Sequence, residues 1–90
     1  MKLTLSVPDY SPETGLICEF EDDYRIGVEI NDDMSVCIKA DKGGLVSLAK
    51  LMLTLSSDHV PDGTHMHFDS YTSLEDGSCE LIIAKGLNEP

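Results

Sequence analysis

The stretch HMHFD, residues 65–69, alternates two imidazoles and a carboxylate with two apolar side chains. If the apolar Met66 and Phe68 point into a core, strand geometry places the other three side chains together on the opposite face. These three are His65, His67 and Asp69. Imidazole nitrogens and carboxylate oxygens are both zinc ligands, so this face is a candidate metal site.

The candidate metal site lacks a full set of ligands. A catalytic zinc needs three protein ligands and an open position, and a structural zinc usually has four. His59 and Glu80 are candidates for further ligands, but the cysteines match no zinc spacing. The competing interpretation places both imidazoles on a solvated sheet face, where they hydrogen-bond to carboxylates such as Glu80. We therefore predict a protein without metal or cofactor, and keep a small metal-binding protein or metalloenzyme as the alternative.

The cysteines do not predict an enzyme either. Cys18 and Cys79 lie in strand-like sequence, with no basic cluster or helix start nearby to activate a thiol, and only Cys37 is expected on the polar side of a strand. Three widely spaced thiols without a CxxC pair are typical of reduced cysteines in a cytosol. We predict a non-enzymatic, cytoplasmic protein.

The charge of the chain is its most unusual bulk property. Seventeen acidic side chains against six basic ones give a formal net charge of -11 at pH 7. Such a field repels nucleic acids and anionic membrane surfaces and attracts basic partners. No stretch approaches the roughly 18 apolar residues of a membrane span, and the amino terminus is too short and too alternating for a signal peptide. We predict binding to a basic protein, and neither nucleic-acid nor membrane binding.

The surplus acids are concentrated in the amino-terminal half. Seven of them fall between residues 19 and 33, where Arg25 is the single basic residue. Clustered like charges cost stability, so a cluster of this kind favours a surface that meets a basic partner, with a merely solvated surface as the alternative. The predicted partner-binding residues are Glu19, Glu21, Asp22, Asp23, Glu29, Asp32 and Asp33.

Four stretches with alternating apolar residues predict antiparallel strands, at residues 3–7, 16–20, 24–30 and 34–40. The last three are joined by short turns and predict a β-meander with one apolar and one acidic face. On that meander Glu19, Glu21 and Glu29 would form one patch, because adjacent strands are about 4.8 Å apart. The four aspartates would lie in the hairpin loops.

A helix is predicted after Asp41, where the apolar period changes. Asp41 is a typical N-cap, and eight of the eleven residues 45–55 are apolar. At about 100° per residue they span an arc of roughly 220° and leave a narrow polar strip of Ser47, Lys50 and Thr54. A single sheet does not need so wide an apolar face. Its flanks are covered either by other parts of the chain or by a second copy, so a homodimer through the helix is the alternative to internal cover.

Two glycines, Gly43 and Gly44, follow the predicted cap. A Gly-Gly pair at a helix start can hold a phosphate. The longer GxxxxGK[ST] pattern is absent, however, and the net negative charge opposes anion binding. We interpret the pair as a turn that uses the flexibility of glycine.

Two more strands follow the helix, with Met66 and Phe68 inward on one and Leu81 and Ile83 inward on the other. The Asp-Gly pair at 76–77 is the strongest turn signal between them. There is no internal repeat, low-complexity tract or linker. The chain is therefore predicted to be one α+β domain over all 90 residues: an antiparallel β-meander, one long apolar helix packed on it and a closing C-terminal β-hairpin.

Three segments resemble a family of small bacterial immunity proteins of polymorphic toxin systems: GGLVSLAKLMLTLS, PDGTHMHFD and LEDGSCELIIAK. They look like a leucine-rich helix, a G-x-H-x-H-x-D strand and an L-E-x-G-S-x-E-L-x-I strand, and the similarity covers residues 43–85. The positions that match the two strand patterns are Gly63, His65, His67, Asp69, Leu74, Glu75, Gly77, Ser78, Glu80 and Leu81.

The resemblance implies an intracellular antidote that binds a cognate toxin domain and blocks its active site, with no chemistry of its own. A strongly acidic chain suits a basic toxin, for instance a nuclease whose cleft holds phosphates. The resemblance does not extend to the acidic amino-terminal half. The prediction of the partner-binding residues therefore depends only on the clustering of carboxylates.

Overall fold

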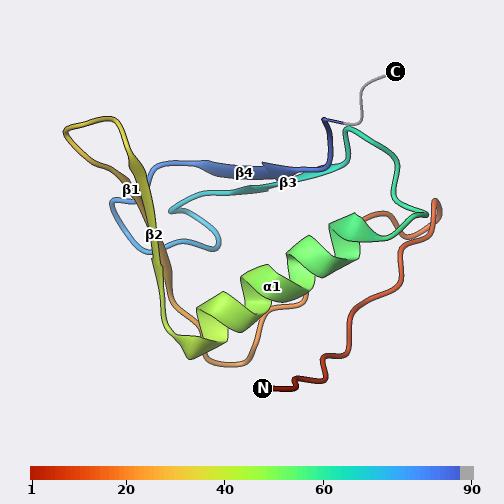
Figure 1. Cartoon of the computed structure of the whole chain (residues 1–90). Helices are drawn as coiled ribbons and strands as arrows, with labels where there is room; N and C mark the ends of the chain where they lie inside the picture. The colour runs from red at the N-terminus through yellow and green to blue at the C-terminus, as the bar shows by residue number, and fades with distance from the viewer. Residues whose placement is uncertain (88–90) are drawn as a thin grey trace.

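A computed structural model describes residues 1–87 of the chain. Its elements are, in order, β1 (Ile26–Ile30), β2 (Val36–Ala40), α1 (Lys42–Ser56), β3 (His65–Phe68) and β4 (Leu81–Ala84). β1 pairs with β2 and β3 pairs with β4, each as an antiparallel hairpin (Figure 1). The α+β class and the closing hairpin are confirmed. No helix within the described residues has the length and apolarity needed to cross a membrane.

The prediction of strands at residues 3–7 and 16–20 is wrong. The described chain before β1 contains one isolated bridge, between Ser11 and Gly15, and is otherwise without regular structure. The predicted three-stranded meander is thus a two-stranded hairpin. Alternation at 16–20 has another cause, because apolar side chains of this segment pack against the core although its backbone joins no sheet.

The edge of β1 that the meander would have used is occupied by the segment after β3. The amide of Glu75 donates to the carbonyl oxygen of Ile26 at 2.8 Å, and the amide of Cys79 donates to that of Val28 at 3.0 Å. The amide of Val28 in turn donates to Ser78 Oγ at 3.1 Å. Residues 75–79 therefore occupy this edge of β1 at Ile26 and Val28, so residues 16–20 cannot add to it as a third strand.

The core lies where α1, the β3–β4 hairpin and the base of the β1–β2 hairpin meet. In Figure 1, α1 lies on one side of the β3–β4 hairpin, and the β1–β2 hairpin stands across one end of both. Phe20 and Tyr24 stack at 4.5 Å, and Phe20 meets Phe68 edge-on at 6.0 Å, so aromatic contacts hold the amino-terminal segment to this core. The buried apolar residues are Ile26, Val28, Leu48, Leu51, Leu55, Val60, Phe68 and Leu74.

Asp41 is the N-cap of α1, as predicted. Its Oδ1 accepts from the amide of Gly44 at 2.8 Å and from the amide of Arg25 at 3.0 Å. One carboxylate thus satisfies an amide of the first helical turn and an amide at the start of β1. These two hydrogen bonds hold the pKa of Asp41 below its ordinary value.

The polar strip of α1 lies under the amino-terminal segment. Ser47 and Thr54 are only 1% and 2% exposed. Ser47 Oγ accepts from the amide of Glu21 at 2.8 Å, and Lys50 Nζ binds Glu21 Oε2 at 2.9 Å. The amino-terminal segment therefore covers the polar strip of the helix and not its apolar flank. A coil segment with unpaired amides needs hydrogen-bond acceptors, which an apolar face lacks.

One apolar flank of α1 is left open by this arrangement. Leu45, Met52 and Leu53 are 55%, 48% and 49% exposed. The buried face of the helix includes Gly44, Ser47 and Thr54 alongside three leucines. A long helix that packs its apolar side on the sheet is therefore not confirmed.

The glycines at the start of α1 serve close packing rather than turn flexibility. A Cβ on Gly43 would overlap the carbonyl oxygen of Asp23, and one on Gly44 would collide with the carbonyl oxygen of Arg25 and lie 2.8 Å from Ile26 Cγ1. The first turn of the helix therefore lies directly against the chain that enters β1.

Candidate binding surfaces

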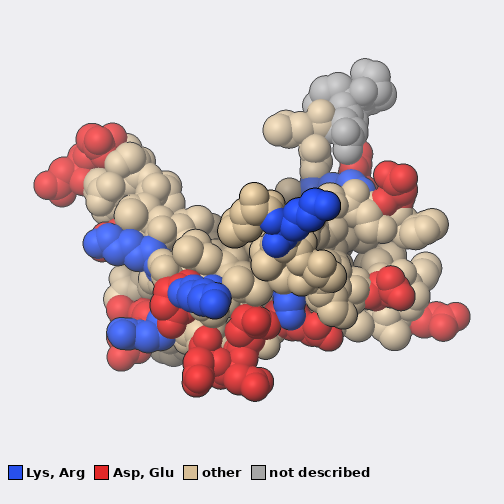
Figure 2. Space-filling view, turned by 60° about the horizontal axis from the view of Figure 1, so that its bottom comes forward, with Lys and Arg blue, Asp and Glu red and all other residues tan. Residues whose placement is uncertain are grey.

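The seven predicted partner-binding carboxylates do not form a single patch. Glu19, Glu21, Asp22 and Asp23 belong to the coil before β1, whereas Glu29, Asp32 and Asp33 belong to the β1–β2 hairpin. Because residues 16–20 form no strand, Glu19 and Glu21 do not lie beside Glu29 on a sheet face. Figure 2 shows acidic side chains at the tip of the hairpin and, separately, along the lower edge of the molecule, with basic side chains between them.

Three of the seven carboxylates already bind groups of their own chain. Glu21 pairs with Lys50, and Glu29 Oε1 lies 2.8 Å from Lys39 Nζ. These contacts raise the pKa of Lys50 and the pKa of Lys39. Asp33 Oδ1 accepts from the amide and hydroxyl of Ser35, which lowers the pKa of Asp33. These three carboxylates therefore make contacts within the fold in addition to contributing negative charge.

The other four carboxylates, Glu19, Asp22, Asp23 and Asp32, are exposed. Asp22 and Asp23 line a surface hollow at the start of α1, together with Asp41 and Lys42. Acids at this position can meet a basic side chain without first breaking an internal ion pair.

The two histidines lie where strand geometry predicts, on the outward face of the β3–β4 hairpin. Both are exposed, and their rings meet edge-on at 4.9 Å. His67 Nδ1 is 3.5 Å from Glu80 Oε2. His65 Nδ1 is 2.9 Å from the carbonyl oxygen of Gly63. This arrangement matches the interpretation of a solvated face with a carboxylate neighbour.

Asp69 does not complete a metal site with these histidines. Its Oδ1 accepts from the amides of Tyr71 and Thr72 at 3.0 and 3.1 Å, so its carboxylate caps the turn that follows β3. His59 lies elsewhere, beside the carboxyl end of α1, where it shares a hollow with Pro8 and Asp9. Within residues 1–87, no group of three or more histidines, cysteines or carboxylates is arranged to hold a metal ion.

The three cysteines are free and half-buried in the described structure. Burial raises the pKa of the Cys18 thiol. A raised pKa favours the neutral thiol over the nucleophilic thiolate. Cys18 is therefore suited to packing rather than to covalent chemistry.

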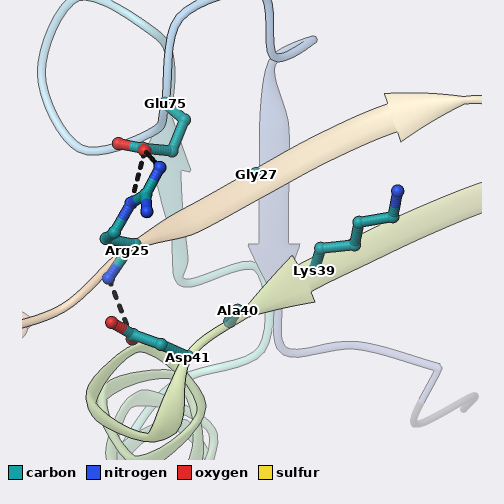
Figure 3. Close-up of a pocket in the computed structure, with 6 residues that line it drawn as sticks. All are labelled: Arg25, Gly27, Lys39, Ala40, Asp41 and Glu75. Atoms are coloured by element: carbon teal, nitrogen blue, oxygen red, sulfur yellow. Dashed lines mark hydrogen bonds and ion pairs between the residues drawn. The ribbon is translucent and has the colours of Figure 1, made fainter.

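One polar cluster joins elements that sequence reasoning did not connect. Arg25 Nη2 lies 2.7 Å from Glu75 Oε1, at the rim of a hollow of ≈ 290 Å³ that Gly27, Lys39 and Asp41 also line (Figure 3). The Glu75 carboxylate raises the pKa of the Arg25 guanidinium. Fifty residues separate the two partners, and no local pattern predicts a pair of this kind. The contact joins the start of β1 to the segment that covers its edge.

Most positions that match the immunity-protein patterns have structural roles. Gly63 and Gly77 have positive φ angles of 92° and 83°. Leu74 is buried, and Ser78 binds β1. The exposed members of the set are His65, His67, Glu75, Glu80 and the two glycines.

These observations describe a small α+β protein with exposed acidic and apolar surfaces. The model of the Immunity protein 32 family matches residues 35–86, more than half of the chain. The chain belongs to this family, which confirms the resemblance to immunity proteins. No curated protein and no solved structure matches the chain. The family match includes β2, α1, β3 and β4, and it begins after the last of the seven carboxylates.

Proposed function

We propose that this protein binds a cognate basic toxin through its carboxylates and blocks the toxin without chemistry of its own. Membership of the Immunity protein 32 family is the observation that carries the proposal. The proposed contact surface comprises the seven carboxylates. Glu19, Asp22, Asp23 and Asp32 are the primary contacts, because they are exposed and are not among the three that already bind groups of their own chain.

The charge of the chain supports a basic partner. A net charge of -11 accelerates association with a positive surface and disfavours wrong partners of the same sign. A nuclease is one class of toxin that fits, because its cleft must hold phosphates and carboxylates can occupy the same positions. The three free cysteines agree with a role in the cytoplasm, where thiols stay reduced.

The first experiment is capture of partners from a lysate of the native organism on the immobilised protein, at low and then at high salt. A toxin with a basic surface that is released at high ionic strength supports the proposal, since surface ion pairs weaken as salt rises. Metal analysis of the same preparation tests the alternative. One bound zinc per chain that His67→Ala removes, without any captured toxin, would support the metal-binding protein instead.

The contact surface is tested with a pair of matched variants. Asp22→Asn with Asp23→Asn removes two exposed carboxylates of the proposed surface, and Glu13→Gln with Asp58→Asn removes two exposed carboxylates elsewhere. Both double variants change the net charge equally. We expect the first to weaken toxin binding about tenfold or more and the second to change it little. Equal losses would show that only the total charge matters.

Glu21 is unsuitable for this test. Its partner Lys50 has a side chain that is only 14% exposed, so removal of Glu21 leaves a largely covered lysine side chain without its ion pair. A loss of binding at Glu21 would therefore combine altered packing with altered contact. The exposed aspartates avoid this ambiguity.

A further inference from the structure

The outer half of the β1–β2 hairpin has an apolar face that the rest of the described chain does not cover. The register pairs Val28 with Ile38 and Ile30 with Val36, so these side chains share the face on which Val28 is buried. Yet Ile30, Val36 and Ile38 are 56%, 60% and 40% exposed. Figure 1 shows this end of the hairpin projecting beyond the helix and the second hairpin. The hairpin is longer than the core that it covers.

The same residues of β2 have open main-chain groups. The amide of Asn31 donates to Ser35 at 2.8 Å and that of Asp41 donates to Arg25 at 3.1 Å, so the odd-numbered residues pair across the hairpin. In an antiparallel ladder the alternate residues then point their N–H and C=O groups outward. On β2 these outward residues are Val36, Ile38 and Ala40, and no residue of the described chain hydrogen-bonds to their main chain at this edge.

The opposite edge of this hairpin shows how an open edge is filled. On β1 the outward residues are Ile26, Val28 and Ile30, and main-chain groups of Ile26 and Val28 bind Glu75, Ser78 and Cys79. An extended segment from elsewhere in the chain thus already adds to one side of the two-stranded sheet. The edge of β2 offers the equivalent main-chain groups, and it has exposed apolar side chains in addition.

Carboxylates stand at both ends of the open edge. Asp32 and Asp33 lie in the loop at the tip, next to the start of β2. At the base, β2 runs into Asp41, which lines the same hollow as Asp22 and Asp23. Arg25, Lys39 and Lys42 are the basic residues nearby. Arg25 is already paired with Glu75, and Lys39 with Glu29. A strand that lies along this edge would meet apolar side chains in the middle and negative charge at each end.

We propose that the outer edge of β2 is the docking site for an extended segment of the toxin, which adds to the β1–β2 hairpin as a third strand. This inference rests on the proposed function and names the surface and the chemistry of the toxin segment. That segment presents main-chain groups to Val36 and Ile38, apolar side chains to the exposed face, and basic side chains near its two ends.

A second copy of this chain fits the edge poorly. Antiparallel pairing of two β2 strands about Ile38 would place the tip of each hairpin beside the base of the other. Asp32 and Asp33 of one copy would then approach Asp22 and Asp23 of the next, and like charges repel. Two strands of five residues also bury far less than the roughly 1,200 Å² of a stable interface. A toxin that contacts the carboxylates as well as the strand is not limited to the area that two short strands bury.

Hydrogen exchange of the free protein and of its complex with the captured toxin tests the docking site. We expect the amides of Val36 and Ile38 to exchange rapidly in the free protein and to become protected in the complex. The amides of Cys37 and Lys39 face β1 and should be protected in both states. The outward amide of Ile82, on the other hairpin, should exchange rapidly in both. Protection that spares Val36 and Ile38 in a tight complex overturns the docking site.

A matched pair of variants provides the second test. Ile38→Lys and Ile82→Lys each add one positive charge at an exposed position of a strand, since these residues are 40% and 51% exposed. We expect Ile38→Lys to weaken toxin binding about tenfold or more and Ile82→Lys less than about twofold. Equal effects overturn the docking site but leave the proposed function standing. A chain that binds no toxin at all overturns both.

Discussion

Ser78 Oγ accepts a hydrogen bond from the amide of Val28 at 3.1 Å, across fifty residues of sequence. The contact explains why a polar segment after β3 lies along a buried strand. Val28 is 2% exposed, and without Ser78 its amide would be buried and unpaired. Together with the amides of Glu75 and Cys79, Ser78 closes one edge of the β1–β2 hairpin and leaves the other edge open.

Ser78→Ala is expected to destabilise the fold. The substitution leaves the Val28 amide without an acceptor, and a lost bond of this kind costs about 1–3 kcal/mol. Urea denaturation measures the free energy of unfolding. Ser6→Ala, in the exposed amino-terminal coil, is the control and should change it little. Similar values for the two variants would mean that water replaces the hydroxyl.

Ser47→Ala should loosen the amino-terminal segment. Ser47 is 1% exposed and accepts from the amide of Glu21, so its removal should cost about 1–3 kcal/mol and increase protease cleavage before β1. Thr54→Val is the matched control, because Thr54 is equally buried but binds only the Lys50 carbonyl of its own helix. Unchanged cleavage in Ser47→Ala would contradict the assigned role.

Gly44→Ala should destabilise the protein although alanine favours helices. Helix propensity alone would stabilise this position by about 1 kcal/mol. The added Cβ would collide with the carbonyl oxygen of Arg25 and lie 2.9 Å from Ala40 Cβ, and overpacking of this kind costs about 1–3 kcal/mol. Thermal unfolding decides the sign. Gly86→Ala, where nothing lies within 4 Å, is the control.

Stability should fall in acid partly through Asp41. Hydrogen bonds from the amides of Gly44 and Arg25 lower its pKa in the folded state. A lowered carboxyl pKa adds stability above the unfolded value of about 3.9, and this contribution disappears as the pH falls through the folded pKa. Asp41→Asn keeps an acceptor oxygen but does not titrate. Its unfolding free energy should therefore depend less on pH below about 4 than that of the wild type, and identical slopes would argue against this assignment.

The open flank of α1 is where a homodimer, the alternative to cover from within the chain, would form. Leu45 and Met52 lie two turns apart on this flank and are both exposed. If they pair two copies, light scattering should show self-association that increases with protein concentration and with salt, because salt screens the repulsion between acidic chains. Leu45→Glu with Met52→Glu should abolish it. A wild-type monomer at all concentrations would reject the dimer.

Local patterns in the sequence were sufficient to predict several features of the structure. Asp41 was predicted as the cap of α1 because a helix start needs an acceptor for its free amides, and the structure confirms it. The β3–β4 hairpin and its outward histidines follow from the strict alternation of residues 65–68. The immunity-protein resemblance rests on the same region, and the family match confirms it.

Only the tertiary structure decided what covers each surface. The alternation of apolar residues at 16–20 indicates that one side of this segment packs on a core. It does not indicate whether a strand edge is free to pair with the segment, and residues 75–79 occupy the edge of β1. Ser47 and Thr54 look like a solvated strip until the amino-terminal coil is placed over them. Side-chain periodicity depends on neighbours in the sequence, whereas a sheet edge, a covered helix face and the spread of seven carboxylates depend on segments that are distant along the chain.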